Sequence, residues 1–117
     1  MLKAKKNDLG KLRYDLIPTG PLRELARVYT IGSKKYADDN WRGGFAWGRV
    51  YAALQRHANA FWSGEQFDPE DDQEHLASVA WCAFTLLEFE RTHREMDTRV
   101  MAKPKRKASK RWRKKSA

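Results

Sequence analysis

Cysteine is almost absent from this chain of 117 residues: Cys82 is the only one, so no disulfide can form within the chain. A single cysteine fits a reducing, intracellular setting. Long hydrophobic runs are also missing. No stretch reaches the roughly 18 apolar residues of a membrane-spanning helix, and no apolar segment follows the basic N-terminus to make a signal peptide. We therefore expect a cytoplasmic protein with no membrane partner.

Acidic residues are missing from the C-terminal end. Residues 1–102 carry fifteen Lys/Arg and fifteen Asp/Glu, whereas residues 103–117 carry nine Lys/Arg and no acid, so the net charge of +9 lies in this tail. We predict a helical domain over 1–102 and a disordered or extended basic tail over 103–117. The tail could be a solubilising extension, or it could bind nucleic acid without sequence preference. The residues that would do so are Lys105, Arg106, Lys107, Lys110, Arg111, Trp112 and Arg113.

Signals of β-strands are missing as well, since no hairpin turn separates alternating apolar segments. Instead, apolar residues recur at helical spacing, which predicts helices over residues 21–37, 47–62 and 69–100. We expect an all-α fold, a small helical bundle built on an antiparallel helical hairpin. Five Trp and five Phe are a large aromatic load. They should be buried in the core, or they could make the chain a helical interaction domain with an oligomer interface.

The predicted helices have defined starts and apolar faces. Pro21 suits the first position of the first helix, and Asp68 with Pro69 is typical of the start of the third. The predicted apolar faces are Leu22, Leu25, Tyr29 and Tyr36; Trp47, Val50, Leu54, His57 with Ala58, and Phe61; and Leu76, Val79, Ala80, Ala83, Leu86 and Leu87, with Phe89 as a further candidate.

Two histidines flank the turn between the second and third predicted helices. His57 lies five residues before Trp62, and His75 lies five residues after Glu70. Because a short loop makes the helices antiparallel neighbours, both imidazoles should lie at about the same height on the hairpin. The carboxylates of Glu65, Asp68 and Glu70 belong to that same end.

Imidazoles and carboxylates together can hold a divalent metal ion, which would be Mg²⁺ or Mn²⁺, with Co²⁺ or Zn²⁺ favoured by nitrogen ligands. We identify His57, His75 and Asp68 as candidate metal ligands. Glu65, Asp68 and Glu70 are the candidate catalytic carboxylates. Each also has a structural explanation, as a hydrogen-bonded core histidine, a helix cap or an acidic first turn. Because they converge at one end of the hairpin, we favour a functional site.

A polar loop over residues 34–44 combines cations, an amide, an aromatic ring and glycines. Such a loop can stack a base and hold phosphates, which makes Lys35, Asn40 and Trp41 candidate substrate ligands. On chemistry alone, a solvated loop anchored by Trp41 is the simpler interpretation. No GxxxxGK[ST] motif is present, so this is not a Walker A loop. Further candidate phosphate ligands are Lys11, Arg13 and Arg56.

Taken in order, these segments resemble a known family. They are GKLRYDLIP at residues 10–18, LARVYTIGSKKY at 25–36, NW at 40–41, RH at 56–57, GE at 64–65, DPE at 68–70 and HLA at 75–77. The set resembles the phage dATP/dGTP diphosphohydrolase family, whose enzymes are associated with genomes that contain 2-aminoadenine. The resemblance covers about residues 8–90.

The resemblance implies metal-dependent hydrolysis of purine deoxynucleoside triphosphates, dATP or dGTP, to the monophosphate and pyrophosphate in a phage-infected bacterial host. It also implies a relation to the all-α pyrophosphohydrolases of the MazG type. Those are helical bundles, usually homo-oligomeric, with Mg²⁺ or Mn²⁺ held by acidic motifs on two helices. The cations Lys11, Arg13, Lys35 and Arg56 would then neutralise phosphate charge, and Asn40 and Trp41 would contact the base or sugar.

This sequence departs from the family pattern at two positions. Ser78 stands where the family has a second histidine, one turn after His75, and Cys82 stands where it has asparagine. The ExxE and ExxD motifs of the MazG type are absent too. If the missing histidine is a ligand, metal binding here is weakened or remodelled. The alternative function is a non-catalytic accessory protein that binds phage nucleic acid through the basic tail.

Overall fold

The computed structural model describes residues 3–100, and its regular secondary structure is helical. Three α-helices are present: α1 spans Thr19–Lys35, α2 spans Trp47–Trp62 and α3 spans His75–Thr92. Short 3-10 helices occur at Tyr14–Leu16, Asn40–Gly43 and Arg94–Met96. Within residues 3–100 there is no strand, only an isolated bridge between Phe67 and Glu74. The all-α prediction is confirmed, whereas the predictions for 103–117 lie outside the described residues.

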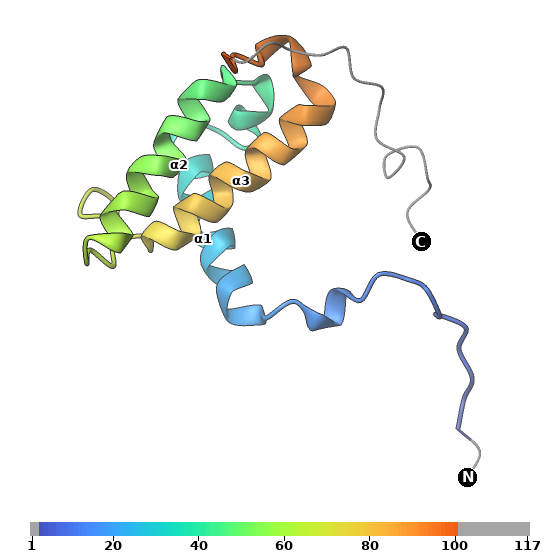
Figure 1. The fold of residues 1–117 in the computed structure, drawn as a ribbon. Helices are drawn as coiled ribbons and strands as arrows, with labels where there is room; N and C mark the ends of the chain where they lie inside the picture. The colour runs from blue at the N-terminus through green and yellow to red at the C-terminus, as the bar shows by residue number, and fades with distance from the viewer. Residues whose placement is uncertain (1–2, 101–117) are drawn as a thin grey trace.

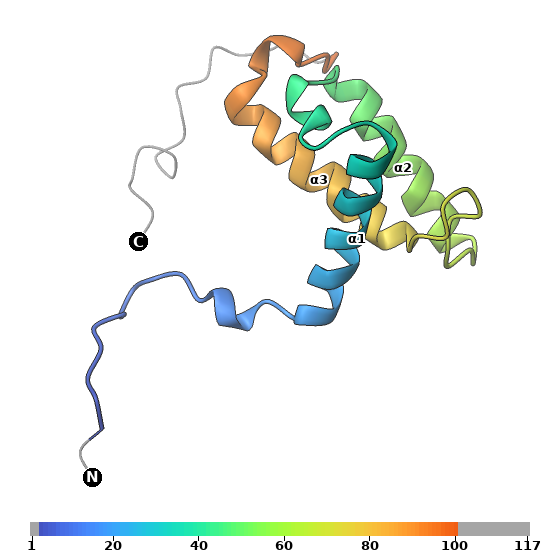
Figure 2. The same ribbon diagram turned by 180° about the vertical axis from the view of Figure 1, so that it is seen from behind.

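Helices α2 and α3 form the predicted hairpin and lie side by side along most of their length (Figure 1). Helix α2 has the bounds that the periodicity predicts, and it buries Trp47 and Val50. These side chains form the core together with Cys82 and Phe89 of α3. Helix α1 packs across the other side of α3, as the reverse view shows (Figure 2).

The start of the third helix was predicted wrongly. Asp68 and Pro69 belong to a turn in which the Asp68 carboxylate accepts the backbone N–H of Glu70. Asp72 has a φ of 60°, a left-handed conformation that stops a right-handed helix. The helix therefore begins only at His75. It also ends earlier than predicted, at Thr92, because the chain turns away at His93, where φ is −140°.

The predicted apolar face of the third helix is wrong in part: Phe89 is buried and Leu86 packs against the core, but other members of the face are exposed. The residues that α3 buries after His75 are Ala77, Ser78, Cys82, Thr85 and Phe89. Leu76 and Leu87, which the pattern places inside, are about half exposed. An apolar residue occurs on nearly every side of this helix, so periodicity could not tell which side its neighbours cover.

The first helix differs from the prediction at its ends. It begins at Thr19 with Pro18 as the preceding cap residue and ends at Lys35, whereas residues 21–37 were predicted. Leu25 is buried, but Leu22 and Tyr36 are exposed. The two ends of the predicted apolar face, Leu22 and Tyr36, therefore lack the core contacts that the pattern predicts.

The segment after α3 folds back over the start of α2. The indole N–H of Trp47 donates to the carbonyl of His93 at 3.1 Å, and the N–H of Gly48 donates to the Thr98 hydroxyl at 2.9 Å. The His93 ring lies 2.8 Å from the carbonyl oxygen of Arg42. We call residues 93–99 the C-terminal strap. It ties the loop before α2 to the hairpin.

None of the helices in the described part of the chain combines the length and the apolar character needed to cross a lipid bilayer.

Candidate functional site

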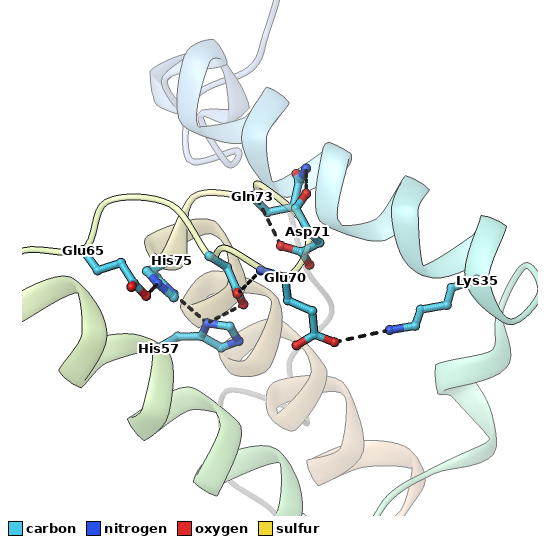
Figure 3. A network of polar contacts seen from close by, with 8 residues as sticks. Lys35, His57, Glu65, Glu70, Asp71, Gln73 and His75 are labelled. Atoms are coloured by element: carbon cyan, nitrogen blue, oxygen red, sulfur yellow. Dashed lines mark hydrogen bonds and ion pairs between the residues drawn. The ribbon is translucent and has the colours of Figure 1, made fainter.

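The two predicted histidines meet at the loop end of the hairpin. His57, near the end of α2, and His75, the first residue of α3, place their Nδ1 atoms 2.9 Å apart (Figure 3). His75 is almost fully buried, with 4% of its surface exposed. The loop between the helices folds back through a hydrogen bond from the N–H of His75 to the carbonyl of Gln66. This bond positions His75 opposite His57 although α3 starts later than predicted.

Glu65 determines how His75 presents its nitrogen atoms. The Glu65 carboxylate lies 2.7 Å from Nε2 of His75, which therefore donates its proton to the carboxylate. In the neutral ring, Nδ1 is then left with a lone pair that faces His57. A carboxylate behind an imidazole is the arrangement that orients metal-binding histidines and makes them more basic.

Asp68 contributes the third group of the cluster. One of its carboxylate oxygens accepts the N–H of Glu70 at 2.9 Å, which holds the turn, and the other lies 3.9 Å from Nδ1 of His57. Asp68 is therefore not the helix cap that the sequence suggests: it stabilises a turn before α3, and its second oxygen faces His57.

The environment of His57 favours its neutral form. Burial lowers the pKa of His57, and the neighbouring charges of His75 and Arg56 lower it further, while Asp68 and Asp71 raise it. A neutral imidazole can offer its lone pair to a metal ion or accept a proton. The site is therefore suited to ligand binding near neutral pH.

The chemistry of this cluster fits a divalent metal ion. One ligand atom from each of His57, Asp68 and His75 lies within 4.8 Å of the others. At metal–nitrogen distances of about 2.0–2.1 Å, two adjacent ligands lie roughly 3 Å apart, which matches the spacing of the two Nδ1 atoms. Two nitrogens and one oxygen leave coordination positions for water or substrate.

Glu70 and Lys35 meet at the rim of the cluster. The Lys35 ammonium lies 3.9 Å from the Glu70 carboxylate, and both side chains are largely exposed (Figure 3). Glu70 is outside the group whose ligand atoms converge. The contact joins the end of α1 to the loop between α2 and α3, residues 63–74.

A cavity of about 840 Å³ opens beside the histidines. This volume is in the usual range for sites that bind small molecules, about 300–1,000 Å³. His57, Glu70 and Ser78 line it, and so do Asn40 and Trp41. The cavity therefore connects His57 of the hairpin cluster with the polar loop that the sequence marks separately.

Aromatic rings form a wall of this cavity. Tyr29 lies 5.8 Å from Trp41 and 6.1 Å from Trp81 between ring centroids. The guanidinium of Arg42 lies 4.6 Å from the Trp41 ring. Burial raises the pKa of Tyr29, so its hydroxyl stays protonated. Such rings can stack against a nucleobase.

The structure brings together most of the predicted site residues but leaves three apart. Lys11 and Arg13 are exposed in the segment before α1, and Arg13 pairs with Asp15 at 2.8 Å. Arg56 is exposed on α2 and reaches the site through its charge alone.

Sequence reasoning did not assign Tyr29, Ser78 and Trp81 to this cavity. Tyr29 and Trp81 have ordinary core spacing, so no local signal distinguished them. Ser78 was noticed only as a departure from the family pattern. Its side chain lines the cavity one turn after His75.

The fold and the site together define a small all-α protein with a histidine–carboxylate cluster beside an aromatic cavity. A profile of the family described as dATP/dGTP diphosphohydrolase, N-terminal, matches residues 2–99. The chain belongs to this family, as its motifs predict.

A curated relative is similar over part of its length. It is a dATP/dGTP diphosphohydrolase of Salmonella phage PMBT28, with 35% identity over 75 residues, which are 64% of this chain. The chain spans about a quarter of that relative, since the matched region is 26% of it. No solved structure matches the chain significantly. The predicted relation to the MazG type therefore stays a prediction.

Proposed function

We propose that this protein hydrolyses purine deoxynucleoside triphosphates, dATP or dGTP, to the monophosphate and pyrophosphate in the cytoplasm of a phage-infected bacterium. The observation that carries the proposal is the contact between His57 and His75 beside Asp68, next to the aromatic cavity that His57 lines. The family match and the printed name of the relative support the reaction.

We assign the metal-binding role to His57, His75 and Asp68. A divalent ion held there would polarise a phosphoryl oxygen and lower the pKa of a water molecule. Mg²⁺ or Mn²⁺ fits a phosphate substrate, and the two nitrogens also suit Co²⁺ or Zn²⁺. Glu65 is a positioning residue, because it acts on the site through the Nε2–H of His75.

Two sets of residues around the cavity would contact different parts of the substrate. Tyr29, Trp41 and Trp81 would stack against the purine, and Asn40 would offer an amide for hydrogen bonding to the base or sugar. Lys35 would meet the phosphates at the other end, since its ammonium already lies at the rim. Glu70, exposed at that rim, would accept the proton of the attacking water.

The test is pyrophosphate release from the purified protein with each of the four deoxynucleoside triphosphates and each of the four metals. We expect turnover of dATP or dGTP, lost in His57→Ala and His75→Ala. The matched control is Asn59→Ala, an exposed side chain two residues beyond His57 on the same helix. No turnover in any combination would rule out the reaction.

A further inference from the structure

The segment before α1 carries apolar side chains that nothing covers in the described part of the chain. Every residue from Lys3 to Pro18, which we call the arm, is exposed, and Leu9, Leu12 and Leu16 expose between 59% and 94% of their surface. In both ribbon views the arm runs away from the helical bundle (Figures 1 and 2). Apolar side chains grouped in this way are typical of an interaction surface, because leaving them in water is unfavourable.

The arm and the loop of the site carry opposite charges. The arm has five Lys/Arg and two Asp, whereas the loop over residues 63–74 has six Asp/Glu and no cation. Lys35 meets Glu70 at the loop, at the far end of α1 from the arm. A helix of 17 residues is about 25 Å long, so the arm starts roughly one helix length from the loop of its own chain.

A third feature is the uncovered side of α3. Leu76, Phe84 and Leu87 are each about half exposed on this helix, although α1 and α2 pack on its other sides. Leu76 directly follows His75, so this apolar face begins at the histidine cluster and continues along α3. It therefore offers an apolar surface that leads to the acidic loop.

We propose that the arm of one copy of this chain docks on the uncovered face of α3 in a second copy. The arm leucines cover that face, and Lys11 and Arg13 reach the acidic loop of the partner copy. There they meet the phosphates of the bound nucleotide. This assignment of the phosphate ligands rests on the proposed function. The docking explains how Lys11 and Arg13, which are remote from the site of their own chain, can bind phosphate at the site of the second copy.

A cross-linking experiment tests the docking without any need for turnover. Copies with Arg13→Cys are mixed with tagged copies carrying Glu70→Cys under mild oxidation. We expect a disulfide that joins the two different copies. Arg91→Cys, at the opposite end of α3, is the matched control and should not cross-link. The native thiol of Cys82 does not compete, because it is buried with its pKa raised to about 11.

Two results would overturn the docking. One is a chain that stays monomeric in light scattering at the highest concentration reached. The other is a single chain carrying both cysteines that closes the disulfide within itself while the mixture does not cross-link. That second result would assign the arm to its own site.

Mixing inactive variants tests the role of the arm in the reaction. Copies with Lys11→Ala and Arg13→Ala keep an intact histidine cluster, and copies with His57→Ala keep an intact arm. In random dimers of the two, about a quarter of the wild-type sites should combine an intact cluster with an intact arm. We therefore expect recovery of about a quarter of the activity. Cross-linking without recovery would refute the phosphate role alone, and an inactive wild type would refute the proposed function instead.

Discussion

Among single residues, Cys82 shows how burial in the core lowers the reactivity of a thiol. It is 2% exposed in the core against Val50 and Phe89, and burial raises its pKa to about 11. Only the thiolate reacts readily with alkylating reagents. We predict that iodoacetamide labels the native protein far more slowly than the urea-unfolded chain. Equal rates would show that this part of the core opens readily.

Glu65 is the residue whose role can be separated from direct contact with metal or substrate. Glu65→Gln leaves an oxygen that can accept the Nε2–H of His75 but removes the negative charge behind the ring. We expect metal affinity to fall by about 10–100-fold, as for other partners of ligating histidines. Titration calorimetry measures this without turnover. Gln66→Ala is the neighbouring control, because its side chain contacts Glu74 rather than the histidines.

At the scale of helices, the face that α3 buries can be tested with two residues. Phe89 is completely buried, whereas Leu87, two positions earlier, exposes 58% of its surface. We predict that Phe89→Ala lowers the free energy of unfolding by about 3–5 kcal/mol, because it leaves a cavity. Leu87→Ala should cost much less. Urea denaturation measures both, and the reverse order would show that Leu87, rather than Phe89, lies in the core.

We predict that the C-terminal strap makes the stability of the protein depend on pH. The hydrogen bond to Glu95 raises the pKa of His93, and the carbonyl of Arg42 raises it further. A raised pKa means that this stabilisation is fully present below the ordinary value of 6.5 and is lost as the pH rises through the folded-state pKa. We expect the melting temperature of wild type, measured across that range, to fall more than that of His93→Gln.

Periodicity was reliable for α2 and unreliable for α3, for a physical reason. Helix α2 has one apolar stripe, so its bounds and its buried Trp47 follow from spacing. Helix α3 is apolar on nearly all sides, and its start depends on the turn that Asp68 and Asp72 form. Pro69 after Asp68 is typical both of a helix start and of such a turn, so the local sequence could not decide between them.

For the whole molecule, charge separates the tail from the helical domain. The nine cations of residues 103–117 stand against a neutral remainder. The second function proposed from the sequence, nucleic-acid binding, therefore depends on this segment, which lies outside the described residues. We predict that a chain ending at residue 102 keeps nucleotide hydrolysis and loses any DNA binding that falls steeply with salt. DNA binding that survives the deletion would show that the helical domain, and not the tail, binds DNA.

The sequence by itself determined the helical class, the hairpin and the pairing of His57 with His75, because these depend on spacing along one or two helices. The tertiary structure decided everything that depends on which surfaces meet. It united the Trp41 loop with His57 in one cavity, buried Ser78 and Cys82 rather than Leu76 and Leu87 of α3, and left the arm with Lys11 and Arg13 apart from the site. Such placements depend on contacts between segments distant in the chain, and local spacing carries no information about them.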